Sequence, residues 1–226
     1  MKIAIIGYGK MGHMIEDVAQ SRGHEIVARI DVGDAFDLKD ADVAIEFTTP
    51  ATAKDNILRA WAQGVPVVCG TTGWQPEELK GEGLELKEVD SKKLIVESKT
   101  GKVMLVWSSN YSVGVNIFFE LNKFLAEQMT AQTQYMPSIK EIHHIHKLDK
   151  PSGTAKTLAE QIRETDLSRY RNIEDIEIES VREGEVPGTH EVTWDSEEDT
   201  IVITHIAKGR RGFALGAVLA AEEIVG

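Results

Sequence analysis

Residues 2–12 read KIAIIGYGKMG, and this stretch decides the fold. A short, mostly apolar run predicts a buried strand, and a G-x-G-x-x-G pattern follows it directly, where a helix is expected to open. Glycines there allow a tight turn, so that a pyrophosphate can bind the free N–H groups at the helix N-terminus. We therefore expect a dinucleotide-binding turn with cofactor contacts at Gly7, Tyr8, Gly9, Lys10, Met11 and Gly12.

An acid follows the second expected strand, about twenty residues after the glycines, as this fold requires. Asp31 at this position can accept hydrogen bonds from the adenine ribose hydroxyls. The alternative is that Asp31 only begins a loop and that the glycines form an empty turn. No arginine follows Asp31, while Arg29 either meets a 2′-phosphate or is an exposed strand residue. We expect NADH to be used at least as well as NADPH.

The first half of the chain alternates apolar runs with helical patterns. Strands are expected at residues 2–6, 25–30, 42–47 and 65–69, and helices at 11–22 and 51–63, each followed by a glycine. This order predicts an α/β, Rossmann-type parallel sheet with right-handed crossovers. Two loops at the carboxyl ends of strands give further candidate cofactor contacts, although such residues populate any turn: Phe47, Thr48, Gly70, Thr71 and Thr72.

The pattern changes after about residue 108. Helices are expected at 113–129, 153–163 and 213–225, and strands at 138–147, 176–183, 190–194 and 200–207. Successive strands joined by turns predict a second, smaller α+β domain with a mixed or antiparallel sheet. Acidic residues at 34–40 and 195–199 indicate solvated loops.

Composition restricts the functional class. The chain has 226 residues, 42% of them hydrophobic, and a net charge of −12, which argues against sequence-independent binding of nucleic acid. The basic residues Lys208, Arg210 and Arg211 are interpreted as a solvated loop or an anion site. The single cysteine, Cys69, excludes an intramolecular disulfide. No apolar run is long enough for a membrane span or signal peptide, so we expect a cytoplasmic protein.

Residues 141–155 read EIHHIHKLDKPSGTA and contain three of the seven histidines. Neighbouring histidines on a strand face opposite sides and no cysteine accompanies them, so we expect no metal. His143 and Lys147 share strand parity, and a bend after His146 can bring both into one pocket as proton donor and charge partner. Ser152, Gly153 and Thr154 then open a helix whose N–H groups can hold a carboxylate. The alternative is exposed histidines and a plain N-cap serine.

This segment resembles the hallmark of the 4-hydroxy-tetrahydrodipicolinate reductase family, also called dihydrodipicolinate reductase. The resemblance continues in order over nearly the whole chain, through GYGKMG at 7–12, GTTG at 70–73, SSNYSVGVN at 108–116, GTHEV at 188–192, TH at 204–205 and GA at 216–217. It implies reduction of 4-hydroxy-tetrahydrodipicolinate to tetrahydrodipicolinate with NADH or NADPH, in lysine and diaminopimelate biosynthesis.

The resemblance also implies an organisation and a set of roles. Residues 1–110 with 209–226 would bind the dinucleotide, and 111–208 would bind substrate and form a homotetramer. His143 would be the proton donor and Lys147 would bind a carboxylate, with His144, Ser152, Gly153 and Thr154 as further substrate contacts. The nicotinamide would be positioned by Gly70, Thr72, Ser109, Asn110 and Tyr111, with Arg210 closing on the cofactor at the hinge.

Two positions depart from the family pattern. Lys150 replaces the usual small residue before Pro151, and Leu215 stands where an Asn is common. One rival interpretation is another amino-acid-pathway dehydrogenase, for example one acting on aspartate or its semialdehyde, which lacks the His-His-x-His-Lys and Pro-Ser-Gly-Thr combination. Another is a dinucleotide-binding module without catalysis, which would need neither His143 nor Lys147.

Overall fold

The computed structural model describes residues 1–79, 85–90, 93–98 and 101–226, with side chains described outside 80–103. The chain forms two compact units, Met1–Val113 with Arg210–Gly226, and Gly114–Gly209. Among the described residues, no helix is both long and apolar enough to cross a membrane.

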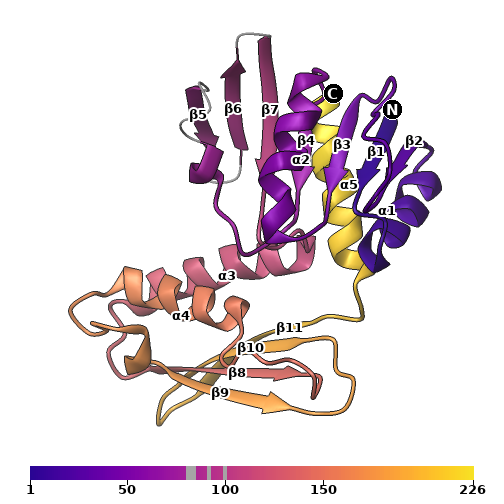
Figure 1. The fold of residues 1–226 in the computed structure, drawn as a ribbon. Coiled ribbons are helices and arrows are strands. Elements are labelled where there is room, and N and C mark those ends of the chain that lie inside the picture. Colours follow the sequence, from indigo (N-terminus) through magenta and orange to yellow (C-terminus); the bar gives the residue numbers. More distant parts are fainter. Residues whose placement is uncertain (80–84, 91–92, 99–100) are drawn as a thin grey trace. The chain divides into compact units, whose positions relative to one another are not determined.

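The first unit is built on a seven-stranded sheet (Figure 1). Its strand order is β2 (Glu25–Ile30), β1 (Lys2–Ile6), β3 (Val43–Glu46), β4 (Val67–Cys69), β7 (Gly101–Trp107), β6 (Lys93–Ser98) and β5 (Glu85–Asp90). The first five strands run parallel, which confirms the expected Rossmann-type sheet. The sequence analysis missed β5, β6 and β7, and the antiparallel β6 and β5 make the complete sheet mixed.

Helices cover both faces of the parallel strands, as strands buried on two sides require. Alternate residues of β1 face opposite ways: Ile3 and Ile5 pack with α1 (Lys10–Ser21) and α5 (Arg211–Val225), while Ala4 and Ile6 pack with α2 (Pro50–Ala62). A 3₁₀ turn, Pro76–Leu79, adds Leu79 to the second cluster. At Gly216 of α5 an added Cβ would lie 1.6 Å from the carbonyl oxygen of Tyr111, so only glycine allows this close packing.

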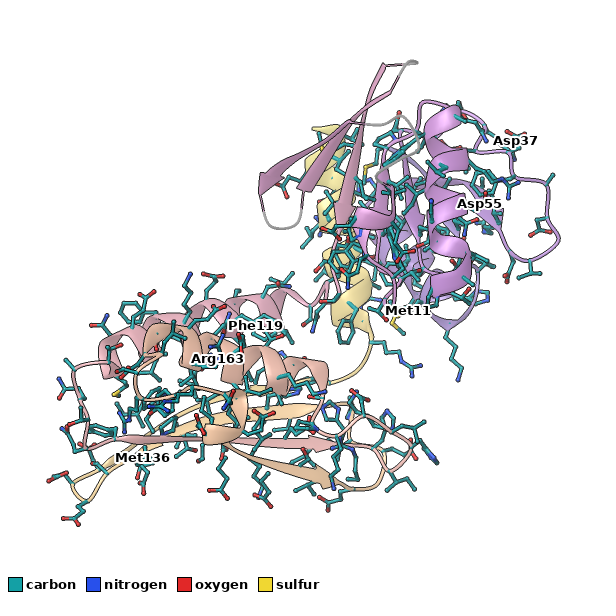
Figure 2. All side chains as sticks on the ribbon, turned by 60° about the vertical axis from the view of Figure 1, so that its left-hand side comes forward. Met11, Asp37, Asp55, Phe119, Met136 and Arg163 are labelled. Atoms are coloured by element: carbon teal, nitrogen blue, oxygen red, sulfur yellow. The ribbon has the colours of Figure 1, made fainter. Side chains whose placement is uncertain are left out.

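The second unit has a four-stranded sheet of order β11 (Thr200–Ile206), β10 (Thr189–Asp195), β8 (Met136–His143) and β9 (Glu177–Arg182). The β8–β9 pair is parallel and the other pairs are antiparallel, so the expected mixed sheet is confirmed. Helices α3 (Val113–Met129) and α4 (Gly153–Thr165) share one core with a single face of this sheet; Figure 2 labels Phe119 on α3 and Arg163 on α4. A 3₁₀ turn, Ile173–Asp175, precedes β9.

One strand boundary differs from the sequence prediction in a way that matters for function. We expected the strand to run from 138 to 147 with a bend after His146, but β8 ends at His143 and the chain turns at residues 145–146. The strand ends because its register with β9 closes at the pair His143–Arg182. The Glu183 N–H then donates to the His143 carbonyl, and the Ile145 N–H to the Gly184 carbonyl. The predicted bend was therefore placed too late.

Candidate cofactor and substrate sites

The glycine-rich turn joins β1 to α1 and is shaped by backbone contacts. Gly7 has φ +92°, and a Cβ there would lie 2.1 Å from the carbonyl oxygen of Phe47. A Cβ on Gly12 would lie 2.4 Å from the carbonyl oxygen of Gly7. Gly9 caps α1 without a side chain, and no acid stands in the first turn. The first N–H groups of α1 are thus open to an anion.

Three cavities surround this turn within the first unit. One of about 420 Å³ extends from Gly7 and Gly9 to Asp31, and one of about 660 Å³ lies over the first turn of α1, where Figure 2 labels Met11. The residues expected to contact the cofactor that line one or more of them are Gly7, Gly9, Lys10, Met11, Asp31, Phe47, Thr48, Gly70, Thr71, Thr72, Ser109, Tyr111 and Arg210. Most of the residues predicted to contact the cofactor therefore line these cavities.

Asp31 lies both at the start of a loop and on the wall of the cavity of about 420 Å³. Its side chain is exposed, and its Oδ1 accepts a hydrogen bond from the Val32 N–H at 2.9 Å. Val32 is itself fully exposed. The acid is thus free to accept further hydrogen bonds, and its immediate neighbour offers no positive charge.

Tyr8 is not among the residues that line these three cavities. Its hydroxyl donates to Glu16, and the guanidinium of Arg29 lies 5.8 Å from the centre of the Tyr8 ring. Arg29 Nε donates to Glu16 Oε2 at 2.9 Å, and its NH2 group binds the other carboxylate oxygen. Hydrogen bonding to Arg29, opposed by burial, lowers the pKa of Glu16 to about 2. Arg29 is therefore already paired with a carboxylate.

The sequence analysis missed Glu46, which links the two loops beside the cavities. Glu46 is fully buried at the end of β3, and its Oε2 accepts hydrogen bonds from Thr71 Oγ1 at 2.7 Å and Cys69 Sγ at 3.0 Å. The Thr48 hydroxyl also donates to Glu46, and the Thr48 N–H donates to Thr71 Oγ1 at 2.8 Å. An acid in the apolar run VAIEF was the available signal. The Thr71 hydroxyl is thereby already engaged in hydrogen bonds with Glu46 and the Thr48 N–H.

Tyr111 and Asn110 shape the loop after β7. The Tyr111 side chain is buried, with its hydroxyl 3.0 Å from the Cys69 carbonyl and 2.8 Å from the Val106 carbonyl. Burial holds the pKa of Tyr111 well above its usual value. Asn110 Oδ1 accepts from the Ser112 N–H at 2.9 Å. These side chains support the loop, while the exposed Ser109 lines a cavity.

In the second unit, a buried polar cluster forms on the face of the sheet that carries the helices. Glu141 and His143 are two apart on β8 and share this face, and His190 on β10 pairs directly with Glu141. His143 Nε2 lies 3.3 Å from His190 Nε2 and 3.3 Å from Glu141 Oε2. The Glu141 side chain is fully buried, and residue exposures of His143 and His190 are 8% and 4%. His143 is therefore not an exposed strand residue.

Ser152 and Arg182 complete the cluster. The Ser152 N–H donates to Glu141 Oε1 at 3.1 Å, and Arg182 NH2 donates to the same oxygen at 3.0 Å. Ser152 Oγ caps α4 by accepting from the Ala155 N–H, and it lies 3.2 Å from His190 Nε2. Burial raises the pKa of Glu141, yet interactions with Ser152, Ser180 and Arg182 lower it overall. The carboxylate is held in its ionised form.

Burial governs both histidines. Burial lowers the pKa of His143, while the Glu141 charge opposes it. Burial, assisted by the nearby His143, lowers the pKa of His190 to about 4. His190 is therefore neutral at physiological pH.

The remaining predicted substrate residues lie around this cluster. Lys147 Nζ pairs with Asp149 at 2.8 Å, and its charge acts on His143. His144 is half-buried, and its Nδ1 has no hydrogen-bond partner among the described groups. Gly153 and Thr154 form the first turn of α4, where helix geometry leaves N–H groups available. Lys150 is exposed.

The argument from sequence against a metal considered the wrong neighbours. It compared His143 with His144 and His146, whereas the structure brings His143 together with Glu141 and His190, with three donor atoms all within 4.8 Å of one another. The charges of Arg182 and Lys147 both act on His143, and they oppose a bound dication. We do not interpret the cluster as a metal site.

Comparison with known proteins places the chain in a family. Residues 1–111 match the sequence model described as dihydrodipicolinate reductase, N-terminus, and residues 114–226 match the one described as dihydrodipicolinate reductase, C-terminus. The chain belongs to the dihydrodipicolinate reductase family. A family member from Christiangramia forsetii, named 4-hydroxy-tetrahydrodipicolinate reductase, is 46% identical, with 98% of this chain and 91% of the relative covered. One of the same name from Archaeoglobus fulgidus is 34% identical, covering 99% and 94%.

Solved structures agree on the fold of dihydrodipicolinate reductases. A dipicolinate-bound dihydrodipicolinate reductase from Paenisporosarcina sp. TG-14 has a TM-score of 0.74 at 21% identity, covering all of this chain and 94% of the other. Aspartate semialdehyde dehydrogenase II from Vibrio cholerae has a TM-score of 0.53 at 11% identity, covering 99% and 97%. The fold alone thus does not separate the family from the rival dehydrogenases considered above. Leu215, the departure in α5, packs partly buried against the core of the first unit.

Proposed function

We propose that this chain reduces 4-hydroxy-tetrahydrodipicolinate to tetrahydrodipicolinate with NADH or NADPH, in the biosynthesis of lysine and diaminopimelate. The carrying observation is that the segment 141–155 folds into a buried acid–imidazole cluster followed at once by the N-terminus of α4. A hydride-transferring dehydrogenase for aspartate semialdehyde would lack this segment. The two full-length relatives carry the name of the proposed activity.

The first unit fits a dinucleotide. At Gly7 and Gly12 any side chain would strike the backbone, so the turn keeps the close approach that a pyrophosphate needs. The open N–H groups of α1 would hold the phosphates, and Asp31 a ribose. When bound, the nicotinamide supplies a hydride. Cofactor contacts are assigned to the cavity-lining residues above, with Tyr8, Gly12 and Asn110 acting through the turn and loop that they support.

The second unit supplies charge and a proton. Lys147 and the first N–H groups of α4, at Gly153 and Thr154, would bind the substrate carboxylates, with His144 beside them. The Ser152 hydroxyl, capping α4, would hold the helix N-terminus in place. His143 would donate the proton that completes the reduction.

Three further properties are proposed on separate observations. NADH is used at least as well as NADPH, because Asp31 is followed by the apolar Val32 and Arg29 is paired with Glu16. The protein works in the cytoplasm, consistent with its one cysteine, which is buried and free. It forms a homotetramer, as the family resemblance implies, and the exposed Met136, Val202 and Ile206 on the face of the second sheet opposite α3 and α4 offer an apolar surface for contact between subunits.

The decisive test mixes the purified protein with NADH or NADPH and freshly formed 4-hydroxy-tetrahydrodipicolinate and follows the loss of nicotinamide absorbance. Rapid turnover is expected. Binding of the cofactor without turnover would instead favour a dinucleotide-binding module, and turnover only with aspartate semialdehyde would favour the rival dehydrogenase.

A further inference from the structure

The buried cluster contains a polar atom that the proposed reaction leaves unexplained. Glu141 Oε1 accepts two hydrogen bonds, whereas Oε2 is buried and no described group donates to it at hydrogen-bond geometry. A nearby uncharged donor is Ser180, which pairs with Glu141 across β8 and β9 and whose own buried hydroxyl also lacks a partner at that geometry; it helps to lower the Glu141 pKa. Oε2 lies 3.3 Å from His143 Nε2 and 3.9 Å from His190 Nε2. A buried carboxylate oxygen without a donor is costly unless positive charge develops beside it.

The geometry points to a proton held on Nε2 of His143, with His190 as its acceptor and the Glu141 carboxylate as its charge partner, so that Glu141 and His190 are positioning residues for the acid. This inference rests on the proposed role of His143 in the reduction. It assigns functions to two residues outside the hallmark catalytic pair, His143 and Lys147.

The positions of the hydrogen atoms follow from the distances. The two Nε2 atoms of His143 and His190 face each other at 3.3 Å, so one of them must carry the hydrogen. If His190 carried it, the Nε2 lone pair of His143 would face the carboxylate oxygen at 3.3 Å, which is repulsive. The proton therefore belongs on His143 Nε2, the nitrogen nearer to Oε2. This leaves Nδ1 of His143 to exchange a proton with the substrate.

The arrangement follows the logic of an acid that orients a histidine by one ring nitrogen while the other nitrogen performs the proton transfer. The imidazolium of His143 gives the Nδ1 proton to the substrate and returns to the neutral form protonated on Nε2, and water supplies the next proton. Glu141 stabilises the positive form through its charge. His190, whose pKa is lowered to about 4 mainly by burial, stays neutral and accepts.

The surrounding elements hold this arrangement in place. Arg182 on β9 fixes Oε1 of Glu141, and Gly188 with φ +151° closes on the His143 ring, where a Cβ would lie 2.9 Å from Cε1. The other charged or titratable groups that act on the two histidines are Lys147 and Asp149 from the loop after β8 and His205 from β11. Their charges are mixed, so Glu141 is the buried group that favours the positive form of His143.

The test compares Glu141→Gln, His190→Leu and His190→Gln with wild type and with a control, His146→Gln, whose side chain is 70% exposed. We expect Glu141→Gln and His190→Leu to lower kcat by about tenfold or more, within the 10²–10⁴-fold that acid catalysis contributes. Neither side chain is assigned to the substrate, but both contact Ser152 at the N-terminus of α4, so KM should rise by a smaller factor than kcat falls. His190→Gln keeps an acceptor and should recover most of kcat, and His146→Gln should match wild type.

A second readout does not require activity. Exchange of the imidazole C2 hydrogen with deuterium, followed by mass spectrometry with fragments that separate His143 from His144 and His146, reports the pKa of His143 without substrate. Glu141→Gln should lower that pKa, and the control should not. Circular dichroism verifies folding, and the His190 pair tests the cluster independently if Glu141→Gln does not fold.

The outcomes separate this inference from the proposed function. An inactive wild type whose His143 pKa responds to Glu141→Gln would overturn the function and leave the charge partnership in place. An active wild type with unchanged kcat and unchanged His143 pKa in the variants would overturn the cluster. Stoichiometric metal in the purified enzyme, with activity lost to a chelator, would also overturn it, because the same three atoms would then be ligands.

Discussion

Glu16 on α1 and Arg29 on β2 form an ion pair over which the hydroxyl of Tyr8 adds a third contact. The pair neutralises the cation nearest to Asp31 in sequence, two positions from it along the chain. A second cation, Arg59 on α2, lines the same cavity as Asp31. Arg29 could bind a 2′-phosphate only if it left Glu16, because a phosphate oxygen and the Glu16 carboxylate compete for the same donors.

Cofactor choice should therefore respond to Glu16. Wild type should use NADH at least as well as NADPH, and Glu16→Gln should shift kcat/KM toward NADPH by releasing Arg29. Steady-state kinetics with both cofactors measures this, with Glu25→Gln on the exposed start of β2 as the control. A wild-type preference for NADPH of about a hundredfold, or about 2.7 kcal/mol in transition-state binding, would contradict it.

Acid stability should depend on Glu222. Arg22 Nε donates to Glu222 Oε1 at 2.7 Å and its NH2 to Oε2 at 2.8 Å, which ties α5 to the end of α1. Hydrogen bonding to Arg22, opposed by burial, lowers the Glu222 pKa from 4.5 to about 2. Because the folded pKa is depressed, the stabilisation is complete above pH 4.5 and is lost as pH falls toward 2.

The measurement is Tm against pH for wild type and Glu222→Gln. The variant should melt lower at neutral pH, by the equivalent of about 1 kcal/mol for a partly exposed pair, and the two curves should converge at the acid end. Glu127→Gln, at an exposed position of α3, serves as the comparison. A constant gap between the curves at all pH values would mean that the carboxylate charge is not what stabilises the helix.

Glu46 should matter for cofactor binding although it lines none of the three cavities around the turn. Glu46→Gln or Thr71→Val removes a bond that joins the loops at Thr48 and Thr71. We expect KM for the cofactor to rise, by about 5- to 30-fold for a buried hydrogen bond costing about 1–2 kcal/mol, with substrate KM little changed. Titration of cofactor fluorescence checks this, and equal losses for substrate and cofactor would indicate general unfolding instead.

Formation of the homotetramer should depend on the face of the second sheet opposite α3 and α4. Val202→Glu and Ile206→Glu place charges where 48% and 65% of the residue is exposed in the single chain. Light scattering should show a tetramer for wild type and smaller species for both variants, because a buried unpaired charge is costly. Val225→Glu near the C-terminus is the control. A monomeric wild type, or variants that remain tetrameric, would contradict this interface.

The order of apolar runs and glycines along the sequence predicted part of the first unit correctly. The strand β1, the glycines and the crossover helices were readable because burial on both faces leaves uninterrupted apolar runs. The strand β5 was missed because ELKEVD has four charged residues among six, and β6 because KLIVES has an apolar run of only three residues. The strand β7, GKVMLVW, has a continuous apolar run typical of a central strand and could have been predicted from it. The role of Glu46 was not predicted, because the residues next to it in sequence do not show which hydroxyl groups will donate hydrogen bonds to its carboxylate.

The cluster of Glu141, His143 and His190 in the second unit could be predicted from the sequence only in part. His143 was readable from its hallmark segment, but Glu141 and His190 are 49 residues apart and meet only through the register of β8 with β10. The alternation of buried and exposed residues predicts which face of a strand a side chain occupies, but it does not predict which strand lies beside it or in what register. The same register with β9 ended β8 four residues early, which moved the expected bend.

Lys147 provides the sharpest test of the substrate site. Its side chain is 23% exposed and its ammonium pairs with Asp149 at 2.8 Å. An ammonium has three N–H donors, so the pair with Asp149 leaves donors for a substrate carboxylate. Lys147→Ala should therefore raise substrate KM and lower kcat together, because the charge acts on both bound substrate and developing charge. Lys150→Ala, three residues away and exposed, is the matched control and should change neither by more than about twofold. If Lys147→Ala kept the wild-type kcat/KM, Lys147 would have no part in binding the dicarboxylate, and the helix N-terminus at Gly153 would have to hold it alone.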